Sequence, residues 1–307
     1  MSTQKVMGGL EWAMLVALSV LWGGSFFFNA IAVKELPPFT FVLLRVGIGS
    51  LVLLALLRFM GFRMPRDWKV WLQFAGMGIL NNIIPFCLIV WSEKRLSGGL
   101  ASVLSASTPL FAVIMAHFLT SDEKATPNKI IGVIIGFVGV AILIGTQVLT
   151  AAGSDVWAEI AVLGAAVSYA SAGIFGRRFK EMGLQPFVTA TGQISSSTLM
   201  LIPLALIFDQ PWNLPMPGQA TWAAVAGISL LSTSLGFVLF FRILATAGAT
   251  NLMLVSFLIP ASAILLGFIF LGEHLAVNHV IGMLTIGLGL ISIDGRLVAR
   301  ASSRVPV

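Results

Sequence analysis

The chain repeats the stretch WLQFAGMGILNNIIPF, residues 71–86, as WAAVAGISLLSTSLGF, residues 222–237. The two copies share Trp, Ala-Gly, Leu and Phe in the same order, 151 positions apart. Apolar matches arise easily by chance, whereas an ordered set that includes Trp and Gly rarely does. The repeat therefore divides the chain into two units, residues 1–150 and 151–307.

The correspondence extends into the rest of each unit. Pro109 aligns with Pro260 at the same offset, and one deletion later Glu123 aligns with Glu273. Several glycines follow in register after the glutamates. The two units are therefore expected to contain the same series of elements.

Composition indicates that these elements lie in a membrane. Of 307 residues, 58% are hydrophobic and 10% are charged, and the mean hydropathy is +0.99. Soluble domains carry about 25% charged residues, so the bilayer must be the solvent of this chain. A spanning helix needs about 20 mostly apolar residues. Turn or charge signals separate ten such runs: 11–33, 39–60, 70–91, 98–119, 129–149, 158–177, 187–208, 220–242, 250–271 and 277–295.

The number of runs in each unit predicts the architecture. Five spans are an odd number, so the second unit must enter the membrane from the opposite side. The predicted fold is an all-α polytopic membrane protein with ten transmembrane helices in two inverted five-helix repeats. Inverted repeats are typical of secondary transporters, which bind substrate near the bilayer midplane between the repeats. An inverted-repeat channel is the alternative.

Basic residues predict the orientation. With the amino terminus inside, fourteen Lys and Arg residues flank the inner ends of the spans and three flank the outer ends. The positive-inside rule therefore places both termini in the cytoplasm, with the protein in the cell (inner) membrane. The net charge of +6 is explained by this topology, so no nucleic-acid partner is expected. The first apolar run lacks a convincing cleavage site and is expected to remain as a helix.

Several motifs resemble a known family. Residues 21–26, LWGGSF, followed by Pro37-Pro38 and Leu44-Arg45, resemble the opening of EamA-type members of the drug/metabolite transporter superfamily. Residues 101–145 and 251–295 resemble that family's paired pattern of a proline-containing helix, a glutamate and a glycine-rich helix. The resemblance covers nearly the whole chain and is closest to the aromatic amino-acid exporters. It implies ten helices and export of metabolites, often amino acids, without a cofactor.

Polar residues at the span centres are candidates for a substrate cavity. Asn81 and Asn82 lie on one face of the third span, and Ser232 occupies the equivalent face of the eighth. An unpaired amide in hydrocarbon costs several kcal/mol, so these groups must face protein or water. Ser105 lies at the centre of the fourth span. Hydrogen bonding between helices is the alternative role, and a common one for Ser and Thr in membranes.

Two aromatic residues complete the candidate substrate-binding set. Tyr169, the single tyrosine of the chain, lies at the centre of the sixth span, and its repeat partner is Trp22 in the first. Both could stack on an aromatic substrate or attract an ammonium group. Ordinary aromatic packing is the alternative. The full set is Trp22, Asn81, Asn82, Ser105, Tyr169 and Ser232.

Prolines, glycines and one arginine give further expectations. Pro109 and Pro260 are expected to kink their helices and act in gating, with a tolerated kink as the alternative. Arg45 is expected to extend outward to the membrane surface, with the capping of an outer vestibule as the alternative. Small-residue seams predict that the fifth and tenth spans pack together, with a homodimer seam as the alternative. The seams consist of Gly132, Gly136, Gly139, Gly282 and Gly289.

The distribution of acidic residues bears on substrate and driving force. All twelve fall at span ends or in loops, and the three histidines also lie near span ends. An intramembrane enzyme is therefore not expected, because no nucleophile and base, and no metal cluster, share a depth. The single cysteine, Cys87, excludes a disulfide framework.

A neutral polar cavity suits an amino acid or similar small zwitterion, moved by facilitated alternating access without obligatory proton exchange. His117 is the one group that could titrate near neutral pH inside a span. Proton-coupled export of other metabolites or drugs is the alternative. The protein is expected to be a monomer or a weak homodimer.

Overall fold

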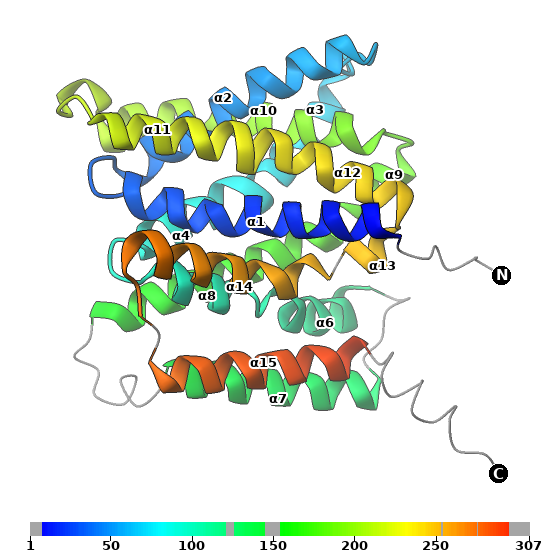
Figure 1. The fold of residues 1–307 in the computed structure, drawn as a ribbon. Coiled ribbons are helices and arrows are strands. Elements are labelled where there is room, and N and C mark those ends of the chain that lie inside the picture. The colour runs from blue at the N-terminus through cyan, green and yellow to red at the C-terminus, as the bar shows by residue number, and fades with distance from the viewer. Residues whose placement is uncertain (1–7, 121–125, 145–153, 253, 275, 295–307) are drawn as a thin grey trace.

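The computed structural model describes residues 8–120, 126–144, 154–252, 254–274 and 276–294. These residues form helices and no strands. The long helices run side by side as one bundle, and the pair α7 and α15 lies at one edge of it (Figure 1). Glu123 and the ends of the fifth and tenth predicted spans lie outside the described residues.

The first half contains five helical rods. The third rod is continuous and consists of α3, the π-helical segment η1 and α4, whereas the fourth is broken between α5 and α6. The bounds are α1 Gly9–Ala32, α2 Pro38–Phe59, α3 Trp68–Gly78, η1 Ile79–Ile83, α4 Ile84–Ser92, α5 Gly98–Ser105, α6 Thr108–Leu119 and α7 Pro127–Ile144.

The second half follows the same order. Its bounds are α8 Ser154–Phe175, α9 Arg177–Glu181, α10 Pro186–Leu204, η3 Ala205–Asp209, η4 Pro211–Asn213, α11 Gln219–Gly227, η5 Ile228–Leu235, α12 Gly236–Thr246, α13 Ala249–Leu252, α14 Val255–Leu266, η6 Gly267–Leu271 and α15 Val277–Asp294. Every predicted span overlaps one of these rods, and the ends that lie among the described residues are shifted by a few residues. The break predicted at Gly248 is present, because this glycine adopts φ +84° after α12.

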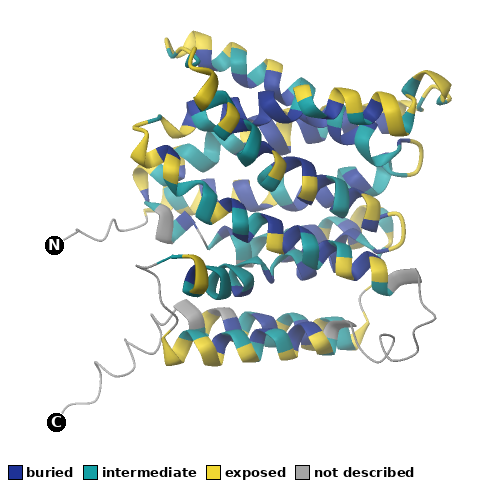
Figure 2. Ribbon diagram, turned by 180° about the vertical axis from the view of Figure 1, so that it is seen from behind, coloured by how far each residue is buried: buried dark blue, intermediate teal, exposed yellow. Residues whose placement is uncertain are grey.

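Seven of the described rods are long and apolar enough to cross a membrane, and three shorter apolar helices accompany them. The shorter segments are Pro127–Ile142, Leu258–Leu271 and Val277–Gly289. Large apolar side chains such as Leu51, Leu72 and Leu284 are exposed along the rods. Buried residues gather in the middle of the bundle, and exposed ones follow its outside and ends (Figure 2). This is the pattern of a protein whose outer surface faces lipid.

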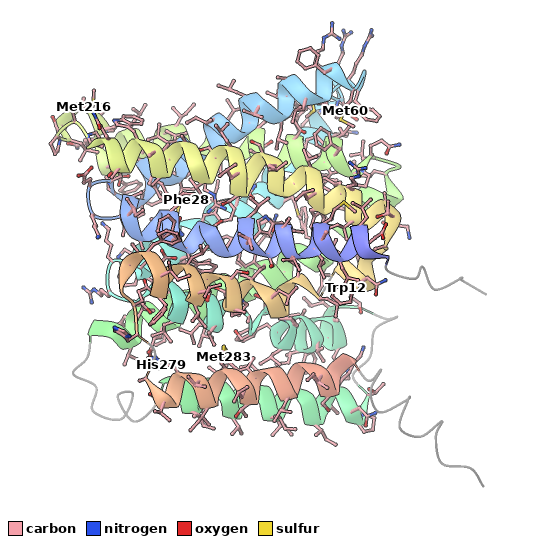
Figure 3. All side chains as sticks on the ribbon, viewed as in Figure 1. Trp12, Phe28, Met60, Met216, His279 and Met283 are labelled. Atoms are coloured by element: carbon pink, nitrogen blue, oxygen red, sulfur yellow. The ribbon has the colours of Figure 1, made fainter. Side chains whose placement is uncertain are left out.

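Four side chains mark the two ends of the bundle (Figure 3). Trp12 and Met60 lie at one end, called here the Met60 end, and Met216 and His279 lie at the other, the Met216 end. The first turn of α1 and the last turn of α15 both lie at the Met60 end (Figure 1).

Helices of one half pack mainly against helices of the other. α1 lies along α14 and along the rod α11–η5–α12, while α8 lies along α5, α6 and the rod η1–α4. α2 packs on α10 and η5, and α10 packs on α3 and η1. α7 packs on α15, and α5 packs on α14. These contacts between the halves are symmetric. For each one, the repeat partners of the two rods are also in contact.

The glycine seams pack α7 against α15, as predicted. A Cβ atom at Gly139 would lie 2.6 Å from the backbone nitrogen of Ile286, and one at Gly289 would lie 2.6 Å from the carbonyl oxygen of Gly132. Only glycine allows the two backbones to approach this closely. Gly139 and Gly289 therefore face the neighbouring helix of the same chain.

Acidic residues at the Met216 end cap helices that belong to the opposite half. Glu273 accepts hydrogen bonds from the backbone nitrogens of Gly98 and Gly99, at 3.1 and 3.2 Å, where α5 begins. Asp209 accepts a hydrogen bond from the backbone nitrogen of Thr40, near the start of α2, at 2.6 Å. Carboxylates satisfy the free N–H groups of a helix start and complement its dipole. These contacts connect the two halves.

Candidate functional site

The two asparagines lie where the third rod becomes π-helical. Asn81 donates from Nδ2 to Oε1 of Gln193 at 3.3 Å, and Asn82 donates from Nδ2 to Oγ of Ser197 at 3.0 Å. Both partners belong to α10, so the amides join two helices of opposite halves. Asn82 is fully buried, and its Oδ1 has no hydrogen-bond partner in the described part of the chain. The alternative role, hydrogen bonding between helices, is therefore present, and one acceptor of Asn82 remains free.

The π-helical segments occupy equivalent places in the two halves. η1 and η5 both interrupt a rod at the polar positions of the repeated stretch. Ser168 of α8 donates from Oγ to the carbonyl oxygen of Leu80 within η1, at 2.7 Å. In η5, Ser234 donates from Oγ to the carbonyl oxygen of Ser229, at 2.9 Å. Short π segments are frequent at functional sites because they redirect side chains and carbonyls.

Two predicted serines have free hydroxyl groups. Ser105 ends α5, and Ser232 lies in η5. The Oγ atom of each is buried without a hydrogen-bond partner among the described residues. Neither hydroxyl group therefore forms a hydrogen bond between helices within the described residues.

The two predicted aromatic residues lie in different surroundings. The indole of Trp22 packs on α12, 5.6 Å from the ring of Phe240, where Gly236 leaves room for it. Tyr169 is half-buried and packs against two core clusters at once. No ring contact joins Trp22 to Tyr169 within the described residues.

The predicted gating prolines differ in position. Pro109 lies in the first turn of α6, directly after the break that separates α5 from α6. Pro260 lies inside α14, with helix on both sides of it. The two prolines therefore occupy different places in their helices.

Arg45 does not extend outward, so that expectation is wrong. Its side chain is 7% exposed, with Cζ 3.8 Å from the centre of the Phe86 ring. Its Nε donates to Oγ1 of Thr233 in η5 at 3.2 Å. Thr233 and Phe86 lie on equivalent rods of the two halves, which attract the guanidinium inward by a hydrogen bond and a cation–π contact.

Two acidic residues that lie near span ends, as expected, are nevertheless buried. Glu93 follows α4 directly and is 6% exposed, and Glu159 of α8 is 4% exposed. Oε1 of Glu93 accepts a hydrogen bond from Nδ2 of Asn29 at 3.2 Å, and its Oε2 has no partner in the described part of the chain. A position at the end of a span therefore does not mean exposure to solvent.

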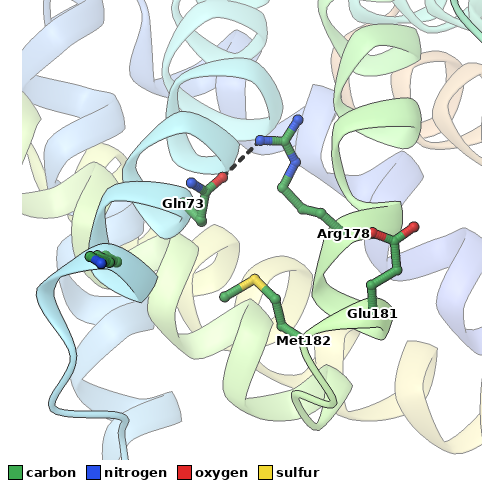
Figure 4. A pocket seen from close by; sticks show the side chains of 5 residues that line it. Gln73, Arg178, Glu181 and Met182 are labelled. Atoms are coloured by element: carbon green, nitrogen blue, oxygen red, sulfur yellow. Dashed lines mark hydrogen bonds between the residues drawn. The ribbon is translucent and has the colours of Figure 1, made fainter.

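A separate pocket of about 400 Å³ opens at the Met60 end (Figure 4). It is lined by Lys69, Gln73, Arg178, Glu181 and Met182. Nη1 of Arg178 donates to Oε1 of Gln73 at 2.8 Å. None of the predicted substrate-binding residues lines this pocket.

The predicted residues make different contacts. The asparagines bond to α10, Trp22 packs on α12, and Tyr169 packs against the core cluster that includes Ile83 and Phe86. The sequence did contain a signal for Arg45, since a charge inside a membrane span is by default a functional candidate. Glu93 carried no such signal, because it is followed by Lys94 and Arg95 and resembles a loop residue.

A bundle of apolar rods with polar groups buried between its two halves defines a multi-pass membrane transporter. The chain belongs to the EamA-like transporter family, whose sequence profile matches residues 9–145 and again 156–293. It is a transporter rather than an enzyme.

Curated relatives are similar over most of their length. The uncharacterized transporter YoaV of Bacillus subtilis is 24% identical over 93% of this chain and 95% of its own. Protein PecM of Dickeya dadantii is 24% identical over 89% of each chain. The uncharacterized inner membrane transporter YedA of Escherichia coli is 24% identical over 85% of this chain and 83% of its own.

The fold is also found in a solved crystal structure. It superposes with a TM-score of 0.66 over 95% of this chain and 99% of its own, at 20% identity. This likeness concerns the fold alone. The names YoaV and YedA identify transporters without a substrate, so the aromatic amino-acid exporter group stays a prediction.

Proposed function

We propose that the protein exports amino acids or similar small zwitterions by alternating access between two inverted five-helix repeats. The observation that carries the proposal is the pair of π-helical segments, η1 and η5, at equivalent places in the two halves. Buried polar groups from both halves gather on these segments. Transporters built from repeats place substrate sites on irregular helices between the repeats.

The packing of the rods supports an inverted relation between the repeats. Each contact between a rod of one half and a rod of the other has a counterpart after the halves are exchanged. With ten rods crossing, an odd number in each half reverses the second half relative to the first. Tilting of the interleaved rods would then open the centre to each side in turn.

We further propose that both termini are cytoplasmic and that the protein lies in the inner membrane. The first turn of α1 and the last turn of α15 share the Met60 end, which is consistent with an even number of crossings. The described basic residues Arg58, Arg63, Arg66, Lys69, Arg177, Arg178 and Lys180 belong to elements that meet at this end. The relative YedA is named an inner membrane transporter.

Facilitated movement is inferred from the absence of a carboxylate at the span centres, and Glu93, which follows the end of α4, is buried all the same. Proton-coupled transport is therefore a second candidate, with Glu93 as the group that would bind and release the proton. Intramembrane carboxylates are common members of proton relays.

Proteoliposomes test both the substrate class and the coupling. Labelled forms of the twenty L-amino acids are offered singly, and at least one should show saturable uptake and exchange. If none is transported, the proposed function is wrong, and single-channel current without exchange would identify a channel. A pH gradient with equal substrate on both sides then separates the mechanisms, since only a proton-coupled transporter accumulates substrate under it.

A further inference from the structure

We propose that the pocket at the Met60 end binds the headgroup of an anionic phospholipid, with Lys69 and Arg178 holding its phosphate. This goes beyond the proposed function, because it assigns a ligand to a site separate from the predicted substrate-binding residues. The proposal follows from two basic side chains that line one cavity, next to apolar side chains that the chain leaves exposed.

The walls of the pocket come from the two halves of the chain and are fixed to each other. Gln73 of α3 accepts a hydrogen bond from Nη1 of Arg178 in α9, at 2.8 Å. The next residues along these helices, Phe74 and Phe179, are buried and stack with their ring centres 5.6 Å apart. The hydrogen bond and the stacked rings hold α9 on α3, so the pocket is preorganised for a ligand.

The guanidinium of Arg178 is held in place with one nitrogen to spare. Its Cζ lies 3.6 Å from the centre of the Phe175 ring, and its Nε donates to the carbonyl oxygen of Phe175 at 3.0 Å. Nη2 has no hydrogen-bond partner among the described residues. An arginine that is already held loses little freedom when it binds a phosphate oxygen.

Lys69 brings a second positive charge to the same cavity. Its ammonium group forms no hydrogen bond or ion pair with another residue in the described part of the chain. Lys69 and Gln73 are four residues apart on one face of α3, so the ammonium group lies one turn from the hydrogen bond that holds Arg178. A phosphate in the pocket would therefore meet cations from both halves.

The charge of the lining indicates a headgroup with a single negative charge. Glu181 lies across the opening from Gln73 (Figure 4) and is the acidic member of a lining that also holds Lys69 and Arg178, so the lining carries a net charge of +1. The phosphodiester of phosphatidylglycerol would neutralise this charge, and its glycerol hydroxyls could donate to the Glu181 carboxylate. Residues 66–73 and 177–182 together contain five basic and two acidic residues, which adds long-range attraction for anionic lipid.

The surface next to the pocket indicates a lipid rather than a soluble phosphate. Trp68 and Leu72 directly precede the two lining residues of α3, and their side chains are 69% and 60% exposed. Met182, which lines the pocket itself, is 40% exposed. Tryptophan favours the level of the lipid headgroups. Acyl chains would lie along this apolar surface while the phosphate reaches into the pocket.

The lipid class is tested on the full chain, purified in a neutral detergent and stripped of lipid. Phosphatidylglycerol, phosphatidylethanolamine and phosphatidylcholine with the same acyl chains are titrated separately, and native mass spectrometry measures the affinity of the first bound lipid. Phosphatidylglycerol should bind about fivefold to tenfold more tightly than the other two, because each of those carries a cation that compensates its phosphate. Equal binding of the three lipids would overturn the proposal.

Two substitutions assign the site. Lys69→Gln and Arg178→Gln should each weaken phosphatidylglycerol binding about fivefold, the effect of one basic residue next to anionic lipid. The matched controls Arg58→Gln and Arg63→Gln remove exposed basic side chains at the same end that do not line the pocket, and they should bind as the original protein does. Equal weakening in all four variants would mean that surface charge alone attracts the lipid.

Folding is checked by the melting temperature of each variant without lipid. If Arg178→Gln does not fold because it loses the bond to Gln73, Lys69→Gln decides alone, since its ammonium group makes no contact that folding needs. Unchanged binding by folded Lys69→Gln protein would refute the site.

A soluble competitor separates a lipid from a free phosphodiester. Glycerophosphoglycerol is the same headgroup without acyl chains, and in excess it should not displace phosphatidylglycerol. Displacement by it, or by inorganic phosphate, would show that the pocket takes soluble phosphates and that the lipid assignment is wrong. None of these measurements involves a transported substrate, so failure of the lipid site and failure of the proposed function are distinguishable.

Discussion

At the scale of single residues, the interior holds polar atoms that packing leaves unused. Asn29 Oδ1, Asn82 Oδ1 and Glu93 Oε2 are buried without hydrogen-bond partners among the described residues. Each such group costs about 1–3 kcal/mol of folding free energy. Buried donors and acceptors are normally paired, so these atoms are candidates for contact with a transported molecule.

The role of Asn82 in transport can be tested by comparing its substitution with that of its hydrogen-bond partner, Ser197. Asn82→Ala and Ser197→Ala remove the same interhelical hydrogen bond, but only the first removes the free Oδ1. Asn82→Ala should therefore reduce transport by about tenfold, the effect of one charge-assisted or buried hydrogen bond. Ser197→Ala should leave transport closer to normal. Initial rates in proteoliposomes, corrected for folded yield, measure this. Equal losses in both variants would mean that Asn82 only joins the helices.

Glu35 gives a pH-dependent contact between the halves. Its Oε2 accepts hydrogen bonds from Oγ1 of Thr221 at 2.6 Å and from the backbone nitrogen of Gly218 at 2.8 Å. These hydrogen bonds lower the pKa of the carboxyl group from its ordinary value of 4.5. A lowered folded-state pKa stabilises the protein above the unfolded pKa and loses this effect as pH falls through the folded value. Glu35→Gln should thus lower the melting temperature slightly near pH 7.

The difference between this variant and the original protein should begin to shrink as pH falls through the ordinary pKa of a glutamate, about 4.5, and should vanish only below the lowered folded-state pKa of Glu35. Thermal unfolding in detergent across pH 3–8 provides the measurement. A difference that persists unchanged at acid pH would show that Glu35 acts through packing instead of charge.

At the scale of elements, departures from regular α-helix concentrate on the rods that meet at the centre. η1 and η5 interrupt the third and eighth rods, and a break separates α5 from α6. In contrast, α7 and α15 are regular helices fastened by glycines at the edge of the bundle. This division indicates a mobile centre and a rigid scaffold pair.

Two glycines of α15 provide a matched test of the scaffold. A Cβ at Gly289 would meet backbone atoms of Gly132 and Gly136 at 2.6 Å, whereas one at Gly287 would meet nothing within 4 Å. Gly289→Ala should destabilise the protein by about 1–3 kcal/mol, as overpacking typically does. Gly287→Ala should be neutral or stabilising by up to about 1 kcal/mol because alanine favours helix. The melting temperatures of the two variants in detergent test this prediction. Equal shifts in melting temperature would contradict the close α7–α15 contact.

At the scale of the whole molecule, the two halves form one packed body rather than two domains side by side. α1 lies among rods of the second half, and α8 lies among rods of the first. Neither half buries its own apolar faces alone. Each half therefore depends on the other for folding, and relative motion must occur by tilting of interleaved rods.

Topology is the prediction that belongs to this scale. Both termini should be cytoplasmic, because basic residues flank the spans on that side. An alkaline phosphatase fusion after residue 307 should be inactive and a green fluorescent protein fusion should fluoresce. Fusions in the loops around Met60 and Met216 serve as inner and outer references. Phosphatase activity at the carboxyl terminus would reverse the orientation.

The sequence alone predicted the ends of the rods and the repeat, and the structure agrees with the spans to within a few residues. These features could be predicted because the bilayer sets the length of each apolar run and because Gly, Pro and charged residues mark its ends locally. The α7–α15 seam could be predicted for the same reason, since the spacing of small residues is a local pattern.

Tertiary structure decided how the interior charges and amides are used. Arg45 and Thr233 are 188 residues apart, and Asn82 and Ser197 are 115 apart, so no local pattern reveals that they bond. Arg45 turns inward because Phe86 and Thr233 together offer a better environment than the membrane surface, and both come from rods that the fold brings together. Burial of Glu93 likewise depends on α1 reaching it with Asn29. Sequence sets which segments cross a membrane, whereas the partner of each buried polar group is chosen by packing between helices distant in the chain.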